Sequence, residues 1–226
     1  MRVHVRGRLG VQLLQAFVGI GQINEDETPE IVVNHGGNMS TAAKSQFELV
    51  TVPNCIISHQ EEFRKTPYWV DGAPSIAFAE RERTIKFLPL KNVNVDSDVV
   101  IHLRMTDKSS VSYDSCKKLV YLAQQENPNS KVSIISDSME FAQRIAEDCK
   151  VETIEGDVTR HWFVALNAKH LYHTPSAYSF STLLYRTDKK QSVVGSSWCD
   201  SLYPGFDSDM LFLNEAKRYC PNLRVL

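Results

Sequence analysis

Three polar residues, of which the arginine could bind a phosphate group, stand close together near the middle of the chain: His102, Arg104 and Asp107. They fall at the end of a largely apolar stretch, residues 99–104, which predicts a buried strand running out into a loop. Side chains two apart on a strand share a face, which places His102 and Arg104 together. A guanidinium there can form two parallel hydrogen bonds with a phosphate. The alternative is a salt bridge between Arg104 and Asp107 that only orders the strand end, and the residues alone leave both interpretations open.

A glycine turn near the N-terminus predicts a second place for an anion. Gly7, Arg8, Leu9 and Gly10 separate a short predicted strand, residues 3–6, from an amphipathic stretch that predicts a helix. Backbone N–H groups at a helix start can approach an anion, and the helix dipole favours negative charge there. A plain tight turn is the alternative, because the three spaced glycines of a dinucleotide-binding loop are absent.

Two further strand-to-helix junctions carry acidic or hydroxyl groups. Asp137 follows the predicted strand 131–136 and could accept hydrogen bonds from a base or ribose, or cap the next helix. Ser138 is placed to cap that helix. The second junction follows the predicted strand 170–173, and its hydroxyls and backbone amides could bind phosphate or act as ordinary helix caps. Its candidate residues are Ser176, Tyr178, Ser179 and Phe180.

Neither of the two Asp-x-Asp pairs predicts a metal site. Asp96 and Asp98 precede their predicted strand, at the wrong end of the sheet to hold a divalent ion against a diphosphate. Asp207 and Asp209 fit the first turn of the last predicted helix, where the dipole favours acids. His35, after an early predicted strand, could face a cleft between two halves or be a solvated loop residue.

Strands alternate with helices along most of the chain, which predicts parallel pairing and an α/β sheet covered on both faces. Strands are predicted at residues 3–6, 31–35, 48–52, 84–88, 99–104, 131–136, 151–154, 170–173 and 193–194. After the first helix, further helices are predicted at residues 113–125, 138–148, 162–168, 176–186 and 210–219.

Composition limits the partners and the compartment that we expect. The chain has 25 basic and 27 acidic residues, well mixed, which argues against nucleic-acid binding. Five dispersed cysteines without a C-x-x-C pair favour the cytoplasm or another reducing compartment over a disulfide framework. The first residues lack the apolar run of a signal peptide, and no apolar stretch approaches the roughly 18 residues of a membrane span.

In their order along the chain, these motifs resemble those of the fucosyltransferase superfamily, in its α-1,2, α-1,6 and protein-O-linked groups. The superfamily opens with a turn of the type G-G-L-G-N-Q-L-F-Q, which is similar to residues 7–15. Its central H-x-R-R-x-D motif, extended to T-D-K in the α-1,6 enzymes, is similar to residues 102–108. Its S-D-D and N-S-T-F-S-W-W motifs are similar to residues 136–138 and 176–180.

The resemblance implies a GT-B-type α/β chain with two Rossmann-like halves, of which the N-terminal one is reduced. Residues 1–94 would form the acceptor side and residues 95–226 the nucleotide-sugar donor side. The implied activity is metal-independent, inverting transfer of a sugar, most often fucose, from a GDP-sugar to an oligosaccharide or glycoprotein. The GDP-sugar is a substrate, and no cofactor is implied.

The resemblance also implies roles for single residues. Arg104 would neutralise the departing diphosphate, which is the charge that most needs stabilisation when the glycosidic bond breaks. His102 and Asp137 would lie by the nucleoside, and residues 176–180 would hold phosphates through hydroxyl and backbone groups. Asp107 would order the loop or assist near the acceptor.

Two departures from the family pattern bear on activity. Met105 replaces the second arginine of H-x-R-R, and Arg8 could supply the lost contact. Ser112 stands where the α-1,6 enzymes have a glutamate that is a candidate general base, although inversion normally needs one. The remaining candidates for that base are Asp107, Asp114 and His35. The alternatives are a non-catalytic nucleotide- or glycan-binding module, a metal-dependent transferase, and a transferase for another activated deoxyhexose or pentose.

Overall fold

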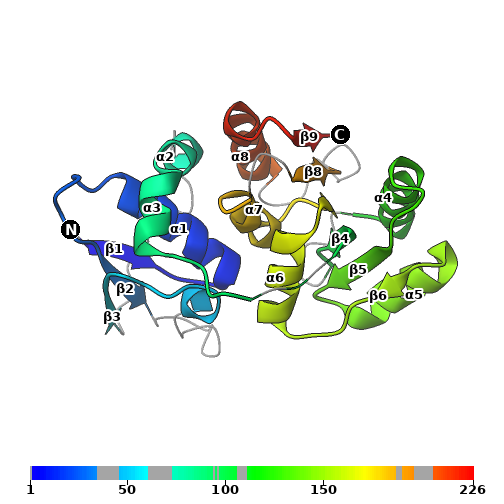
Figure 1. Ribbon diagram of the computed structural model, residues 1–226, viewed down its shortest axis with the longest axis horizontal. Helices are drawn as coiled ribbons and strands as arrows, with labels where there is room; N and C mark the ends of the chain where they lie inside the picture. The colour runs from blue at the N-terminus through cyan, green and yellow to red at the C-terminus, as the bar shows by residue number, and fades with distance from the viewer. Residues whose placement is uncertain are drawn as a thin grey trace. The chain divides into compact units, whose positions relative to one another are not determined.

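The computed structural model describes residues 2–34, 46–60, 73–93, 95, 97–105, 111–186, 190–195 and 206–226. The chain divides into two compact units, residues 1–92 and 93–226. Each unit contains its own parallel sheet accompanied by helices (Figure 1). No helix in the described ranges is both long enough and apolar enough to cross a membrane.

The first unit is built on a three-stranded parallel sheet in the order β1-β2-β3. Helix α1 packs on β1, and a glycine allows the close approach: a Cβ on Gly19 would lie 2.3 Å from Cγ1 of Val3. The elements of this unit are β1 (Arg2–Val5), α1 (Leu9–Gly21), β2 (Glu30–Asn34), the 3-10 turn η1 (Gln46–Leu49), β3 (Ile56–Gln60), α2 (Ala73–Ala79) and α3 (Arg81–Phe87).

The strand predicted at residues 48–52 is wrong. This segment begins as the turn η1, which buries Phe47, and beyond it Thr51 makes an isolated bridge to Leu90. The third strand of the sheet is instead β3, which the sequence did not predict. Its side chains are half-buried or exposed, so it lacks the continuous apolar run by which buried strands are identified.

The strand predicted at residues 84–88 is also wrong, because helix α3 covers most of it. The Thr84 N–H donates to the Glu80 carbonyl, and the Leu88 N–H donates to the Thr84 carbonyl. Thr84 and Leu88 are both fully buried, which is the four-residue spacing of a helix face rather than the alternation of a strand.

The second unit is an α/β domain whose six strands pair in parallel in the order β6-β5-β4-β7-β8-β9. Its elements are β4 (Val99–Leu103), α4 (Tyr113–Glu126), β5 (Val132–Ser136), α5 (Met139–Cys149), β6 (Glu152–Thr153), α6 (Val158–Asn167), β7 (His170–His173), α7 (Ala177–Leu183), β8 (Gln191–Val194), α8 (Phe206–Tyr219) and β9 (Leu223–Val225).

This strand order contains a reversal next to the first strand. The chain runs outward from β4 through β5 to β6, then returns through α6 to place β7 on the other side of β4. The result is the strand order of doubly wound Rossmann sheets. In such sheets a ligand lies outside the carboxyl ends of the two strands where the order reverses, which in this unit are β4 and β7.

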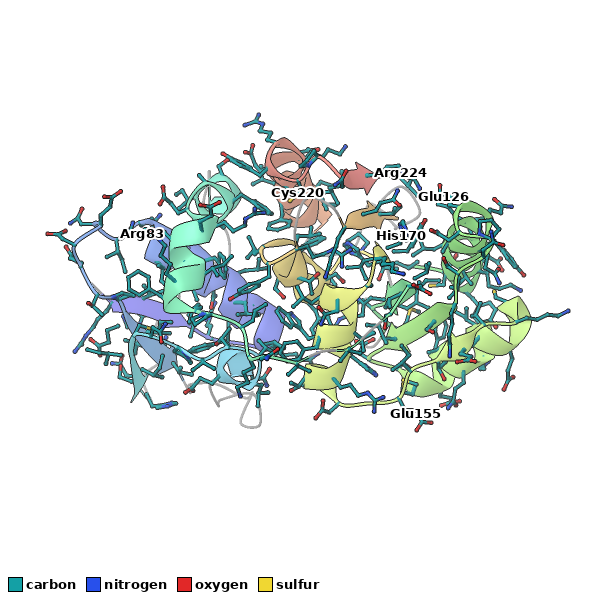
Figure 2. The ribbon with its side chains drawn as sticks, viewed as in Figure 1. Arg83, Glu126, Glu155, His170, Cys220 and Arg224 are labelled. Atoms are coloured by element: carbon teal, nitrogen blue, oxygen red, sulfur yellow. The ribbon has the colours of Figure 1, made fainter. Side chains whose placement is uncertain are left out.

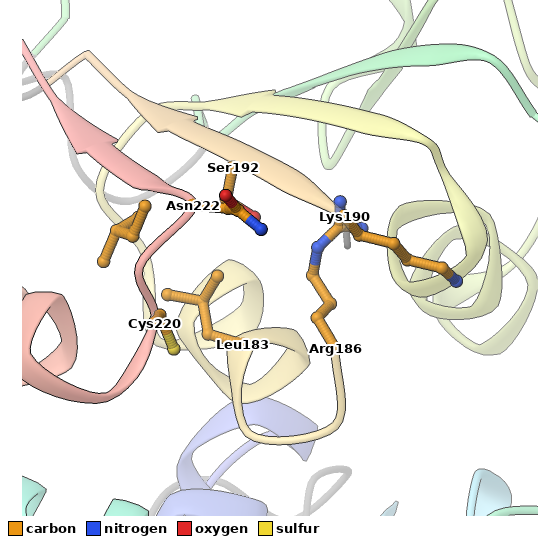
Figure 3. A pocket seen from close by; sticks show the side chains of 7 residues that line it. Leu183, Arg186, Lys190, Ser192, Cys220 and Asn222 are labelled. Carbon is orange, nitrogen blue, oxygen red and sulfur yellow. The ribbon is translucent and has the colours of Figure 1, made fainter. Parts of the chain in front are cut away.

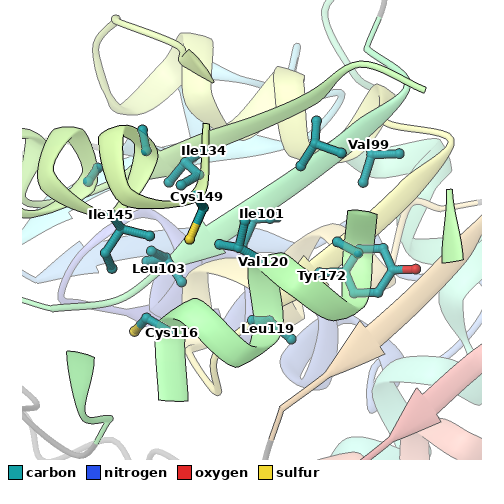
Figure 4. Close-up of a cluster of buried hydrophobic side chains, with 14 of the residues drawn as sticks. Val99, Ile101, Leu103, Cys116, Leu119, Val120, Ile134, Ile145, Cys149 and Tyr172 are labelled. Atoms are coloured by element: carbon teal, nitrogen blue, oxygen red, sulfur yellow. The ribbon is translucent and has the colours of Figure 1, made fainter. Parts of the chain in front are cut away.

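Side chains alternate along β4 between the two covered faces of the sheet. Val99, Ile101 and Leu103 belong to a hydrophobic cluster with α4 and α5 (Figure 4). Val100 belongs to a second cluster that includes residues of α6. His102 shares the parity of Val100, so it faces the side of α6 and α7.

Side chains cap three of the described helix starts in this unit, and a fourth lacks such a bond. Ser112, Asp157 and Ser176 each accept a hydrogen bond from a backbone N–H in the first turn of α4, α6 and α7. Ser138 occupies the cap position of α5 but makes no such bond, contrary to the sequence prediction. Its own N–H donates to Oγ of Ser136 at 3.1 Å, which orders the turn from β5 into α5 in another way.

A polar network ties the last strand to the end of α4 (Figure 2). Nη2 of Arg224 in β9 donates to both carboxylate oxygens of Glu126, at 2.6 and 2.7 Å. The hydroxyl of Tyr172, in β7, donates to Oε2 of the same glutamate at 2.6 Å. The ion pair therefore helps to hold the edge strand in place.

Candidate functional site

Arg104 is held at the carboxyl ends of three adjacent strands. It follows β4, and its Nη1 donates to Oδ2 of Asp137, which follows β5, at 2.7 Å. The two side chains are 16% and 20% exposed. The other carboxylate oxygen of Asp137 accepts the Met105 N–H at 2.8 Å, and the Arg104 N–H donates to Oγ1 of Thr174, after β7, at 2.9 Å. These contacts fix the guanidinium beside the strand-order reversal.

His102 lies next to this arginine and is buried against α7. Its Nδ1 shares a 2.6 Å hydrogen bond with Oγ of Ser179, and the ring centroid is 5.0 Å from that of Tyr178. Burial, with a smaller contribution from His173, lowers the pKa of His102 to about 3. The ring is therefore neutral at pH 7, and it acts as a hydrogen-bonding group with one donor and one acceptor nitrogen.

The structure places the other predicted phosphate-binding residues on the first turn of α7. The Ser176 hydroxyl caps the helix by accepting the Tyr178 N–H at 3.2 Å. The Tyr178 hydroxyl donates to the Val158 carbonyl at 2.6 Å. Phe180 is fully buried and stacks on Phe212 with 4.7 Å between ring centroids. In this geometry Ser176 caps a helix, as the alternative interpretation expected, and the Phe180 ring belongs to the core.

His173 is the β7 neighbour of His102, and the two are register partners in the parallel sheet. Its side chain is fully buried, and burial lowers its pKa to about 3. Nδ1 lies 3.2 Å from the Thr174 carbonyl oxygen, whereas Nε2 has no hydrogen-bond partner within the described part of the chain. Two neutral histidines therefore lie side by side under the end of the sheet.

The predicted N-terminal anion turn is present between β1 and α1. Gly7 has φ +86°, a conformation that strains other residues. The Leu9 N–H donates to Oε1 of Gln46 at 2.7 Å, so this amide is already bonded. In the part of the chain that the structure describes, the amides of Gly10 and Val11 have no acceptor. The turn therefore offers two adjacent donors at the start of a helix.

Two glutamines set the shape of this turn. Gln12, fully buried, donates from Nε2 to the Gly7 carbonyl at 2.9 Å and accepts the Gln46 N–H at 2.8 Å. Oε1 of Gln15 accepts the Arg6 N–H at 2.8 Å. The glutamines of the family-like motif thus act within the fold, by tying the turn to η1 and to the end of β1.

Two predicted catalytic residues, Asp107 and His35, lie outside the described residues, as does Asp96. Asp98 pairs with Lys169 at 2.6 Å, and Asp114 is exposed in the first turn of α4. Asp207 and Asp209 fall in the first turn of α8, which begins four residues earlier than predicted. Among the described residues no group of three or more His, Cys, Asp or Glu could hold a metal ion.

Sequence reasoning missed two residues that position the site. Thr174 belongs to the strand-to-helix junction that the sequence singled out, so a hydroxyl directly after a strand was the available signal. Gln46 gave no signal, because its contact with Leu9 joins residues that are 37 positions apart.

The strand order and the residues at its reversal define a class: a doubly wound α/β domain with a cation at its ligand-binding edge. No protein-family model matches the chain, and no curated protein sequence matches it. Two similar solved structures are a NodZ alpha-1,6-fucosyltransferase soaked with GDP-fucose and the fucosyltransferase NodZ from Bradyrhizobium. Each match covers 82% of this chain and 92% of the other, with a TM-score of 0.49 and identities of 12% and 11%. The function proposed for the chain rests on its own residues.

Proposed function

We propose that this chain is a metal-independent, inverting glycosyltransferase that transfers fucose from GDP-fucose to a glycan acceptor. The observation that carries this proposal is the position of Arg104. Asp137 and Thr174 hold its side chain and backbone at the strand-order reversal, where a doubly wound sheet binds its ligand. A cation there is suited to the diphosphate of a nucleotide sugar.

In the proposed reaction, an acceptor hydroxyl oxygen forms a bond to the anomeric carbon of the sugar. The bond from that carbon to the diphosphate oxygen breaks, and its electron pair leaves on GDP. The acceptor proton passes to a general base. The negative charge that develops on the diphosphate is the largest electrostatic change, and a prepositioned guanidinium stabilises it. Arg104 is the residue to which we assign this role.

The remaining residues are assigned by their chemistry. His102 is neutral, so it would bind the nucleoside through hydrogen bonds rather than charge. Asp137 would keep Arg104 in place, a more specific role than the nucleoside contact expected from sequence. In the first unit, the amides of Gly10 and Val11 would bind a phosphate oxygen at the start of α1. The GT-B arrangement of the two units is part of the proposal.

We propose that the general base is one of three residues: Asp107, His35 or Asp114. Asp114 is exposed on α4, and the other two lie outside the described residues. Ser112 cannot serve as the base, because it is a hydroxyl that caps α4 by accepting the Ser115 N–H at 3.1 Å.

A non-catalytic nucleotide-binding module is the second candidate function, and the packing of Met105 favours it. Met105 packs on the cluster beneath α4, with its sulfur 3.8 Å from that of Cys116. The position that carries a second arginine in the family is thus used for the hydrophobic core. A module would bind the nucleotide without turning it over.

A ligand screen followed by a turnover assay tests these proposals. We expect GDP and GDP-fucose to raise the thermal unfolding temperature more than UDP or TDP and their sugars. A ligand at 100 times its Kd adds about 2.7 kcal/mol of apparent stability. The chain should then release GDP from GDP-fucose when glycan acceptors are supplied, and the rate should be the same with and without EDTA. Loss of activity in EDTA would contradict metal independence, binding without turnover would favour the module, and no protection by any nucleotide diphosphate would contradict both.

A further inference from the structure

A small hollow lies where β8 and β9 begin (Figure 3). Arg104 lies at the other end of the second unit's strands, after the carboxyl end of β4. The cavity volume of the hollow is about 10 Å³, room for a single water-sized species, and the space around it opens to solvent. Leu183 and Cys220 form an apolar part of its lining. Its polar residues are Arg186, Lys190, Ser192 and Asn222.

Arg186 brings a buried positive charge to this hollow. Its side chain is only 5% exposed. Nη1 donates to the carbonyls of Ala165 and Leu166 at 2.7 and 3.2 Å, and Nη2 donates to the Gln191 carbonyl at 2.7 Å. These acceptors are neutral, and no carboxylate pairs with Arg186 within the described chain. A buried charge without an opposite charge is unfavourable, so the site favours an anion.

Lys190 adds a second cation without supplying a counter-charge. Its Nζ donates to the Leu166 carbonyl at 3.1 Å, and Figure 3 shows its ammonium end directed away from the hollow. Proximity to Arg186 contributes, after burial, to a lowered pKa of Lys190. The partial negative charge at the end of α6 offsets only about half an elementary charge.

Three polar groups of the hollow have no partner within the described residues. Nε of Arg186 is buried and makes no hydrogen bond. The Ser192 hydroxyl and the Asn222 amide also make none, although Ser192 is only 3% exposed. Figure 3 shows the Ser192 and Asn222 side chains next to each other, across the hollow from the Arg186 side chain. A guanidinium N–H, a hydroxyl and an amide are all donors to an anion.

We propose that this hollow binds one chloride ion, held by Arg186, Ser192 and Asn222. Oxyanions such as phosphate are favoured where both Nη groups of an arginine present a fork. Here Nη1 donates to two carbonyls and Nη2 to one, so the fork between the two Nη groups is occupied, and the Nε–H and one Nη2 N–H remain. These guanidinium N–H groups and the two neutral donors line a cavity of only about 10 Å³, which suits a monatomic anion of one charge better than a tetrahedral oxyanion. The ion would balance Arg186 and join the end of α7 to β8 and β9.

Thermal unfolding at constant ionic strength tests this site, with chloride exchanged stepwise for gluconate. We expect the unfolding temperature to rise with chloride and then level off, because the ion binds only the folded chain. Ser192→Ala and Asn222→Ala should each remove at least half of that rise. Ser133→Ala, a matched change of a buried serine in β5, should keep it in full. Arg104→Ala should also keep it, which separates this hollow from the proposed donor site.

Line broadening of the ³⁵Cl NMR signal gives a second readout that does not depend on stability. The wild-type chain should broaden the line, and the Ser192→Ala, Asn222→Ala double variant should broaden it much less. No chloride dependence in either measurement would overturn the proposal and leave the hollow to water. Equal chloride responses in the double variant and the wild type would overturn it as well, because the ion would then bind elsewhere. A larger response to phosphate than to chloride would contradict the choice of ion.

Discussion

The Arg104–Asp137 pair both holds a positive charge at the end of β4 and orders the loop that follows it. Asp137 uses one oxygen for the guanidinium and the other for the Met105 N–H, so it orders both the charge and the loop. The sequence located Arg104 because a polar residue at the end of an apolar strand is visible in the pattern. It did not identify the partner, because the pairing requires β4 to lie beside β5 with Leu103 opposite Ser136.

Removal of the Asp137 carboxylate should therefore destabilise the fold. We expect Asp137→Ala to lower the free energy of unfolding by about 2 kcal/mol, because it removes the carboxylate that pairs with a mostly buried cation and accepts a backbone N–H. Chemical denaturation of the wild type and the variant measures the difference. Asp148→Ala removes an exposed partner of Lys117 and should change stability far less. Equal losses in the two variants would contradict the structural role of Asp137.

Two of the buried histidines, His102 and His173, predict a loss of stability in acid. Burial lowers the pKa of both His102 and His173 to about 3, whereas the pKa of an unfolded histidine is about 6.5. Between these values the unfolded chain binds protons that the folded chain does not, so the free energy of unfolding falls as the pH falls. Each histidine contributes at most about 1.4 kcal/mol per pH unit.

Urea unfolding between pH 7 and pH 5 measures this dependence. His173→Phe keeps a ring beside Phe180 and removes one titrating group. The variant should lose less stability per pH unit than the wild type. An unchanged pH dependence would show that His173 is not held neutral by burial.

At the scale of elements, the strand-turn-helix from β1 to α1 is held by side chains rather than by its glycines alone. Gln12 joins the Gly7 carbonyl to the backbone of Gln46 and Phe47. The glycine turn was predictable from sequence, because Gly7 and Gly10 lie between two regular patterns. Its connection to η1 was not, because that contact spans more than 30 residues.

Gln12→Ala should disturb this turn more than an ordinary helix substitution. The change leaves the amides of Gln46 and Phe47 without their acceptor, and we expect it to lower the free energy of unfolding by about 3 kcal/mol. Gln143→Ala, at an exposed position of α5, is the matched control and should stay within about 0.5 kcal/mol of the wild type. Hydrogen exchange at residues 46 and 47 should accelerate only in Gln12→Ala. Unchanged exchange there would contradict the proposed link.

Buried strands are easier to predict from the sequence than short, partly exposed elements. The strands β4 and β5 are largely apolar runs in a covered parallel sheet, so the sequence pattern identifies them. The edge strand β3 and helix α3 are partly exposed and short, and their patterns are ambiguous. The site could be predicted as far as it lies directly at the ends of the buried strands. Contacts that depend on which strands are neighbours could not.

At the scale of the whole molecule, the second unit contains the strand-order reversal and the cation beside it. The first unit has, in its described part, a helix start with two amide donors. The proposal assigns the donor mainly to the second unit and the acceptor to the first. Because Met105 packs against the hydrophobic core, Arg104 must supply the positive charge with which the loop after β4 binds the phosphate.

The most direct test is the affinity for GDP of the wild type, Arg104→Ala and Arg144→Ala, measured by isothermal titration calorimetry. Arg144 is an exposed arginine of α5 and serves as the matched control. Hydrogen bonds to charged groups are worth about 1.5–3 kcal/mol, which corresponds to a Kd raised by about 10- to 150-fold in Arg104→Ala. Arg144→Ala should bind GDP as the wild type does. Equal GDP affinity in Arg104→Ala and the wild type would contradict the assignment of Arg104 to the donor diphosphate.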